Sequence, residues 1–225
     1  KDTSFINKET HSLFDGYDNL SLSSNILEIY MSDKSIKKLN QLNTPFMLVT
    51  DNTPFYPEGG GQISDIGTIS SKNTKIKVLN VQKINNLILH HAILESGEIN
   101  VGDRVQMEID ALRRKKITIN HSSTHLLNQA LREVLGSHVE QKGSLVTDKY
   151  LRFDFSHNKP LSLDEIASIE KIISNEISAC VATKQKITPN VIIEFARLYG
   201  FQVDFQRDIR KNDPYQIIYE TFIDE

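Results

Sequence analysis

The sequence predicts an α+β protein in which a small β-barrel precedes a subdomain of helices and strands. Short β-branched runs separated by turn residues fill residues 26–110, and closely spaced short strands are typical of a small barrel or curled sheet. Over residues 122–135 the hydrophobic period then becomes that of a helix. We therefore expect a lead-in or linker over 1–24, a β-barrel over 25–112, an α+β subdomain over 113–182 and a C-terminal tail over 183–225.

The expected strands are rich in β-branched and other apolar residues. In the barrel they are FMLVT (46–50), KIKVLNVQ (75–82), NLILHH (86–91) and RVQMEID (104–110). Further along, LRFDFSH (151–157) alternates apolar and polar residues, so we expect a half-buried strand there, with Asp154 exposed on its polar face.

Three helices are expected in the second half of the chain. The first covers residues 122–135. Ser162 and Glu165 form a capping box ahead of isoleucines at helical spacing, which predicts a second helix. Thr188 and Pro189 are typical of the start of a third helix, which would run through Arg197 and stop at Gly200.

The composition is ordinary for a soluble globular protein, with 39% hydrophobic and 24% charged residues and no apolar run of the roughly 18 residues that a membrane span needs. The single cysteine, Cys180, excludes an internal disulfide and fits a reducing compartment, so we expect a cytoplasmic protein. The net charge of −3 means that nucleic acid would need a local basic patch. Because the chain starts at Lys1, we expect it to be a piece of a longer protein.

Two histidines one helical turn apart form the first candidate site. His121 and His125 lie in INHSSTHLLNQALREVLGSH (119–138). At about 100° per residue they fall opposite the apolar stripe of Leu127, Ala130, Leu131 and Val134. A zinc ion can bridge two imidazoles at this spacing, but it needs three or four ligands. The alternative is that two polar residues occupy a solvated helix face.

Two further stretches are candidate binding sites. TPFYPEGGGQ (53–62) contains Gly59, Gly60 and Gly61, which either form a β-turn or let a ligand approach the backbone, with Tyr56 and Gln62 as polar contacts. The run Arg113, Arg114, Lys115 and Lys116 is either a solvated face or a phosphate-binding surface. No Walker loop, dinucleotide fingerprint or nucleophile elbow is present in the sequence.

Four stretches, in order and in spacing, resemble the editing region of alanyl-tRNA synthetases and its free-standing relatives. They are GYDNL (16–20), TPFYPEGGGQISDIGTI (53–69), RRKKITINHSSTHLLNQALREVLGSHVEQKGSLV (113–146) and LRFDFSH (151–157), and they cover roughly residues 14–180. The resemblance implies the editing portion of an alanine–tRNA ligase, which hydrolyses tRNA(Ala) mischarged with serine or glycine. A second hydrolytic site is the usual remedy when a synthetic pocket rejects an analogue poorly by size.

The resemblance also implies roles for individual residues. His121 and His125 would be the first two ligands of a zinc ion, which would orient the substrate or polarise a water. Thr124 would line the amino-acid pocket, and Gln141 would lie beside the aminoacyl ester. The loop Gly59–Gln62 would help to discriminate serine.

The implied partners are tRNA(Ala) and the remaining, ATP-binding parts of the synthetase, with no membrane and no DNA. Contacts with the tRNA would involve the basic run 113–116.

The last part of the chain departs from the family pattern. The family completes its zinc site with a Cys-x-x-x-His motif, whereas Lys184 stands four residues after Cys180 and no histidine follows His157. From about Val181 the family pattern is not recognisable. Three explanations stay open. The domain has lost its metal and serves as a tRNA-binding or spacer module, or the missing ligands lie outside this chain, or His157 or Cys180 substitutes for them.

Overall fold

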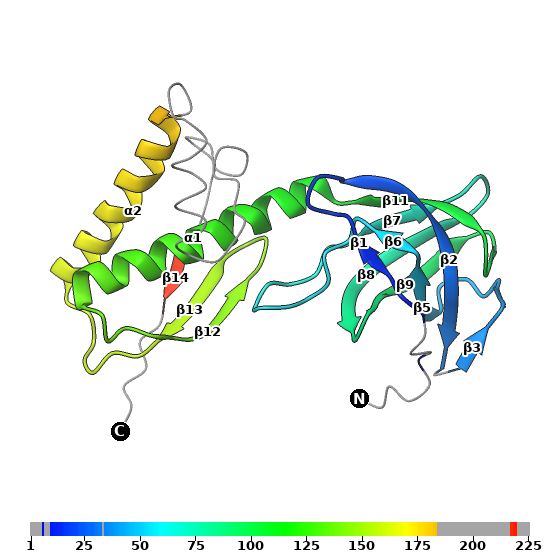
Figure 1. Cartoon of the computed structure of the whole chain (residues 1–225), viewed down its shortest axis with the longest axis horizontal. Coiled ribbons are helices and arrows are strands. Elements are labelled where there is room, and N and C mark those ends of the chain that lie inside the picture. The colour runs from blue at the N-terminus through cyan, green and yellow to red at the C-terminus, as the bar shows by residue number, and fades with distance from the viewer. Residues whose placement is uncertain (1–5, 7–9, 33, 184–216, 220–225) are drawn as a thin grey trace. The chain divides into compact units, whose positions relative to one another are not determined.

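Figure 1 shows a computed structural model of the chain, which describes residues 6, 10–32, 34–183 and 217–219. The chain divides into two compact units, Lys1–Arg114 and Lys115–Glu225. Strands dominate the first unit, and the second combines helices and strands, so the described residues confirm the predicted α+β class.

The first unit is built around a closed barrel of six strands, counted over the described residues. Around the ring the strands are β2 (Ser21–Met31), β5 (Pro45–Thr50), β9 (Leu87–Ser96), β8 (Lys75–Ile84), β7 (Gly67–Ser70) and β11 (Arg104–Ile109), and β11 pairs again with β2. All six pairings in the ring are antiparallel. Closure leaves the ring without the unpaired strand edges that promote aggregation.

Short strands extend this barrel. β3 (Lys34–Ile36) pairs with β2, β1 (Leu13–Phe14) pairs in parallel with β6 (Asn52–Thr53), and β4 (Lys38–Leu39) pairs with β10 (Ile99–Asn100). The four expected barrel strands are confirmed to within a few residues, and the predicted lead-in contains β1 and the start of β2.

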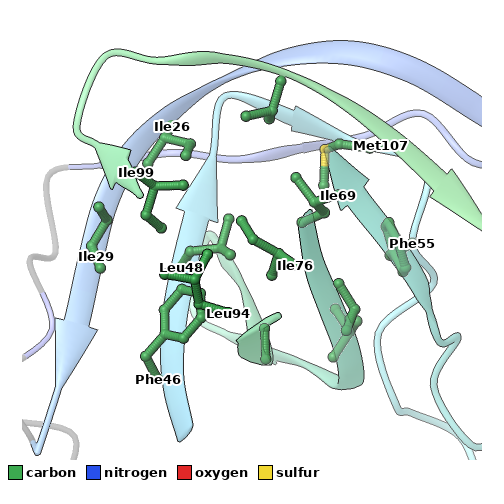
Figure 2. Packing of buried hydrophobic residues seen from close by; sticks show 14 of the residues in the cluster. Ile26, Ile29, Phe46, Leu48, Phe55, Ile69, Ile76, Leu94, Ile99 and Met107 are labelled. Carbon is green, nitrogen blue, oxygen red and sulfur yellow. The ribbon is translucent and has the colours of Figure 1, made fainter. Parts of the chain in front are cut away.

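Alternation along the strands builds the barrel core. In β11, Val105, Met107 and Ile109 are buried while the residues between them are exposed. These side chains meet apolar residues of the other strands inside the barrel, including Ile26, Leu48, Ile69, Ile76 and Leu94 (Figure 2). Full burial of one such side chain stabilises a fold by about 1.5–3 kcal/mol, so this cluster accounts for much of the unit's stability.

The second unit contains most of helix α1 (Ala111–Leu135), the hairpin of β12 (Gln141–Val146) and β13 (Leu151–Phe155), helix α2 (Leu163–Thr183) and β14 (Ile217–Tyr219). The sheet order is β12-β13-β14, and β14 runs parallel to β13. The unit's core joins α1, β13 and α2 through the buried residues Leu126, Leu127, Ala130, Leu131, Val139, Leu151, Phe153, Phe155, Ile169 and Ile173.

The helix ends differ in how well the sequence predicted them. α1 begins at Ala111 rather than at 122 because Asp110 caps it: its Oδ1 accepts a hydrogen bond from Arg113 N at 2.9 Å. The capping box of α2 is confirmed, since Ser162 N donates to Glu165 Oε2 at 2.8 Å and Glu165 N donates to Ser162 Oγ at 3.2 Å. The third expected helix, at 188–197, lies outside the described residues.

The prediction for Asp154 in β13 is only partly right. Asp154 does alternate away from the core, but it is half-buried rather than exposed, because its carboxylate lies against Gly143 of the neighbouring strand.

In the described part of the chain, no helix combines the length and the apolar character that a bilayer crossing requires.

Candidate functional site

The histidine pair lies on α1, on the side of the helix that faces away from the core. Leu127, Ala130 and Leu131 are buried, Arg132 is exposed, and His121 and His125 are half-buried. The two ring centroids are 5.1 Å apart with an interplanar angle of 47°. The predicted shared face of the two imidazoles is therefore present in the fold.

Burial affects the protonation of both rings. Desolvation, helped by the charge of His125, lowers the pKa of His121 from 6.5 to about 4, and desolvation also lowers the pKa of His125. Both imidazoles are therefore neutral at pH 7, the form in which histidine binds metals and accepts protons. A fully solvated helix face would not desolvate them in this way.

The described residues do not supply the rest of a zinc site. Among them, no group of three or more His, Cys, Asp or Glu side chains lies close enough together to hold a metal ion. His157, one candidate substitute ligand, lies instead against His138, with its Nδ1 3.0 Å from His138 Nε2. Cys180 falls in α2, and its side chain lies outside the described part of the structure. Two imidazoles alone do not fit a tetrahedral zinc ion.

Thr124 lies between the histidine face and the sheet. Its buried hydroxyl donates to the backbone oxygen of Asn120, one turn earlier, at 2.9 Å. Asn120 Nδ2 in turn donates to Thr147 O, just beyond β12, at 2.8 Å. Since Asn120 and Thr124 share a helix face, this bond places Thr124 toward the hairpin and about 60° around the helix from His121.

Gln141 is the first residue of β12 and is exposed. It pairs with Phe155 of β13, and a β-bulge follows between Gln141 and Gly143. Gln141 is six residues from Thr147, which is roughly 20 Å along a strand. The fold thus separates Gln141 from the turn of α1 at Asn120 and His121, so a ligand that touches both must extend along the hairpin.

The bulge brings Gly143 close to Asp154. A Cβ atom on Gly143 would lie 2.6 Å from Asp154 Oδ2, so any larger residue there would displace the carboxylate. On the other side, Arg152 Nε lies 3.1 Å from Asp154 Oδ1.

The glycine loop forms a tight turn at the edge of the first unit. Gly59 N donates to Gln62 O at 3.1 Å, and Gln62 N donates to Gly59 O at 3.0 Å. Gly60 and Gly61 between them have φ values of 59° and 83°, a conformation that glycine adopts without strain. All three glycines are exposed, whereas Gln62 is buried, so the loop offers its backbone rather than Gln62 at its surface.

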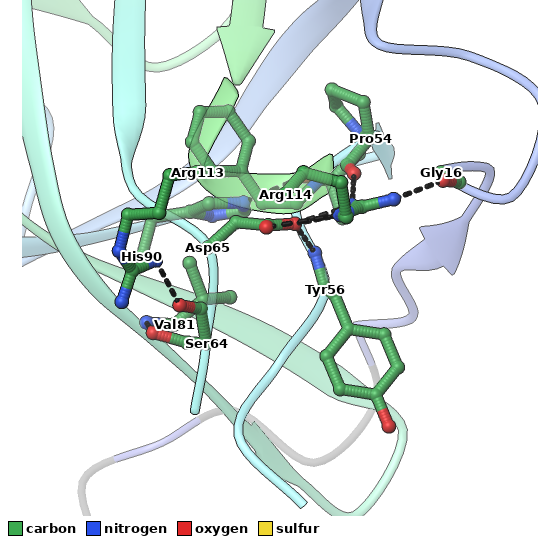
Figure 3. Close-up of polar contacts among 11 residues, drawn as sticks. Gly16, Pro54, Tyr56, Ser64, Asp65, Val81, His90, Arg113 and Arg114 are labelled. Atoms are coloured by element: carbon green, nitrogen blue, oxygen red, sulfur yellow. Dashed lines mark hydrogen bonds and ion pairs between the residues drawn. The ribbon is translucent and has the colours of Figure 1, made fainter. Parts of the chain in front are cut away.

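The two arginines of the basic run are bound within the first unit (Figure 3). Arg114 forms an ion pair with the buried Asp65, with Nε 3.0 Å from both carboxylate oxygens, and it also donates to Gly16 O at 2.6 Å and Pro54 O at 2.9 Å. Arg113 Nη1 donates to Ser64 O at 2.7 Å. These bonds hold the first turn of α1 against the loops around residues 16, 54 and 64–65 of the same unit.

The four basic residues thus differ in their exposure and in their bonds to the protein. The guanidinium of Arg114 bonds to the protein on several sides, whereas Lys115 and Lys116 are exposed on α1. Sequence reasoning missed Asp65 and the contact between His138 and His157, because each joins residues far apart in the chain. The one local signal was a lone acid, Asp65, within the otherwise apolar and small residues of ISDIG (63–67).

A comparison with protein families finds one match that coincides with the barrel unit. The family model for tRNA synthetases class II (A) matches residues 1–113, which is just over half of the 225 residues. Members of this family bind tRNA as a substrate. The chain therefore belongs to the class II (A) tRNA synthetases, the alanyl-tRNA synthetase family, with a role in alanyl-tRNA aminoacylation.

Proposed function

We propose that this chain is the editing portion of an alanine–tRNA ligase and hydrolyses the ester of tRNA(Ala) mischarged with serine or glycine. The observation that carries the proposal is the pair of neutral, half-buried imidazoles, His121 and His125, 5.1 Å apart on α1. Membership of the synthetase family supports tRNA as the substrate. The single cysteine supports a cytoplasmic location as part of this proposal.

The proposed reaction assigns water activation and substrate contacts to residues of this chain. Hydrolysis requires a water molecule to attack the ester carbonyl and to lose a proton. A neutral imidazole of the pair would hold this water and accept its proton as the water oxygen bonds to the carbonyl carbon. The ester bond to the terminal ribose then breaks, the imidazole returns the proton to the leaving ribose hydroxyl, and the free amino acid is released. Thr124, on the adjoining helix face, would contact the amino-acid part of the substrate. Gln141, at the start of β12, would contact the aminoacylated end of the tRNA where that end extends along the hairpin. Lys115 and Lys116 would contact phosphates.

A second candidate function rests on the incomplete ligand set. Because the described residues contain no group of three metal-binding side chains, a tRNA-binding or spacer module without zinc is the alternative. Such a module would bind tRNA(Ala) through its basic residues and release no amino acid. The two candidates therefore differ in a single measurable reaction.

The test is deacylation of Ser-tRNA(Ala) by the full chain. The proposal expects serine release above the spontaneous rate, and it expects His121→Ala/His125→Ala to abolish the excess. His11→Ala is the matched control, because His11 is an exposed histidine in the first unit. Release at the spontaneous rate, together with retained tRNA binding, would establish the spacer module instead. Metal analysis of the same samples tests zinc: about one ion per chain supports the metal, and none excludes it.

A further inference from the structure

The two-histidine clasp, His138 and His157, lies outside the residues predicted for the site. His138 Nε2 and His157 Nδ1 are 3.0 Å apart, and the rings are stacked with centroids 5.2 Å apart. His138 is exposed, whereas His157 is buried and its Nε2 has no hydrogen-bond partner among the described residues. In the part of the chain that the structure describes, the bond to His138 is therefore the hydrogen bond that holds the ring of His157.

The clasp acts on the short segment between α1 and β12. This segment is held on both sides of Val139, which is itself fully buried in the core of the unit. Glu140 N donates to Ser156 Oγ at 3.1 Å, and Ser156 N donates to Glu140 O at 3.0 Å. Ser156 Oγ also donates to His138 O at 3.3 Å. Ser156 and His157, which directly follow β13, thus contact residues 138–140 at several points.

Gln141 comes directly after this segment. The β-bulge between Gln141 and Gly143 interrupts the regular ladder of the hairpin immediately beyond it. Because the ladder is irregular beyond Gln141, its backbone is held by its own pairing with Phe155 and by the contacts of the residues that precede it.

We propose that the two-histidine clasp is a positioning device that sets Gln141 against the aminoacylated end of the tRNA. The inference rests on the proposed editing function, because it gives the clasp a role in that reaction. His138 and His157 are positioning residues in this proposal, since neither touches the substrate. Displacement of a contact residue by about 1 Å can cost up to two orders of magnitude in rate, so loss of the clasp has a measurable consequence.

Three variants of the full chain test the proposal kinetically on Ser-tRNA(Ala). His138→Ala removes the bond, and we expect kcat to fall about tenfold while KM changes less than twofold. His138→Gln keeps a side-chain amide within reach of His157, and we expect it to recover most of kcat. The control is Ile173→Val, which loosens the core of the same unit away from β12. We expect it to leave kcat unchanged.

Amide hydrogen exchange in the absence of tRNA provides a readout that does not depend on activity. With His138→Ala, exchange at residues 140–143 should accelerate at least tenfold relative to β13, and His138→Gln should reverse this. If exchange at residues 140–143 is unchanged in His138→Ala, the clasp does not hold this segment, and the proposal is wrong even if the enzyme is active. If exchange is faster but kcat is normal, the clasp holds the segment but does not position Gln141, and the proposal is also wrong. An inactive wild-type chain would reject the editing function, and the positioning role with it, while exchange still reports whether the clasp holds the segment.

Discussion

Replacement of Arg114 by Met should destabilise the barrel unit far more than the same change at its neighbour, Arg113. The side chain of Asp65 is 3% exposed and that of Arg114 is 14% exposed, so their ion pair is largely shielded from water. Arg114→Met would leave the carboxylate buried and would remove the donors to Gly16 O and Pro54 O.

The size of this effect follows from the contacts that remain. Removal of one partner from a buried ion pair costs about 3–5 kcal/mol. Asp65 would keep its hydrogen bond from Tyr56 N at 2.7 Å, so we expect the lower end, about 3 kcal/mol. Arg113→Met loses the bond to Ser64 O and should cost about 1 kcal/mol. The double variant Arg114→Met/Asp65→Asn should lose less stability than the sum of the losses in Arg114→Met and Asp65→Asn, because it leaves no unpaired buried charge.

The assay is urea unfolding with amide exchange read by mass spectrometry on barrel peptides, because the two units need not unfold together. The midpoint for barrel peptides should shift strongly for Arg114→Met and only slightly for Arg113→Met. Equal shifts for the two variants, or strict additivity in the double variant, would refute the assignment of Arg114 to the barrel.

Three further predictions concern other parts of the chain. Burial lowers the pKa of His90 from 6.5 to about 4. The unfolded chain therefore binds this proton more readily, and barrel stability should fall by about 3 kcal/mol as the pH drops from 6.5 to 4. Urea midpoints at each pH measure this, and His90→Asn should flatten the part of the profile that His90 causes. Lys115→Ala and Lys116→Ala should weaken tRNA binding and each reduce its salt slope by about 1, as filter binding at several salt concentrations would show. An unchanged slope would remove them from the interface. Gly143→Ala should destabilise the hairpin by about 1–3 kcal/mol through its clash with Asp154, and Gly143→Ala/Asp154→Gly should recover part of the loss in thermal unfolding; no recovery would contradict the clash.

Local patterns predicted the barrel strands and one helix cap well. In β11, apolar residues alternate with polar ones, and in α2 the capping box stands just before the isoleucines. The first part of α1 was missed because Ile117 and Ile119 are two residues apart, which is a strand-like spacing, and because Asp110 was not recognised as a cap. Strand β14 was missed because its partner, β13, is more than sixty residues away in sequence.

The candidate site divides in the same way between local and distant contacts. A spacing of four residues sufficed to predict that His121 and His125 share a face of α1. The ion pair of Arg114 with Asp65 spans 49 residues, and the clasp of His138 with His157 spans 19. Local spacing in a single sequence does not identify the two partners of such pairs, because they meet only when the fold brings distant segments together.

The protonation state of His121 and His125 supports the binding role proposed for this face of α1. Two imidazoles at the ordinary pKa of about 6.5 would be partly charged near neutral pH and would repel each other at short range. The fold instead half-buries both rings and keeps them neutral. On a solvated helix face, glutamine or lysine would serve equally well, and no side chain would be desolvated. The lone pairs of neutral imidazoles are acceptors for a water proton, for a substrate hydroxyl or for a metal ion. The neutral state and the 5.1 Å spacing of the two rings are therefore consistent with the binding role proposed for this face of α1.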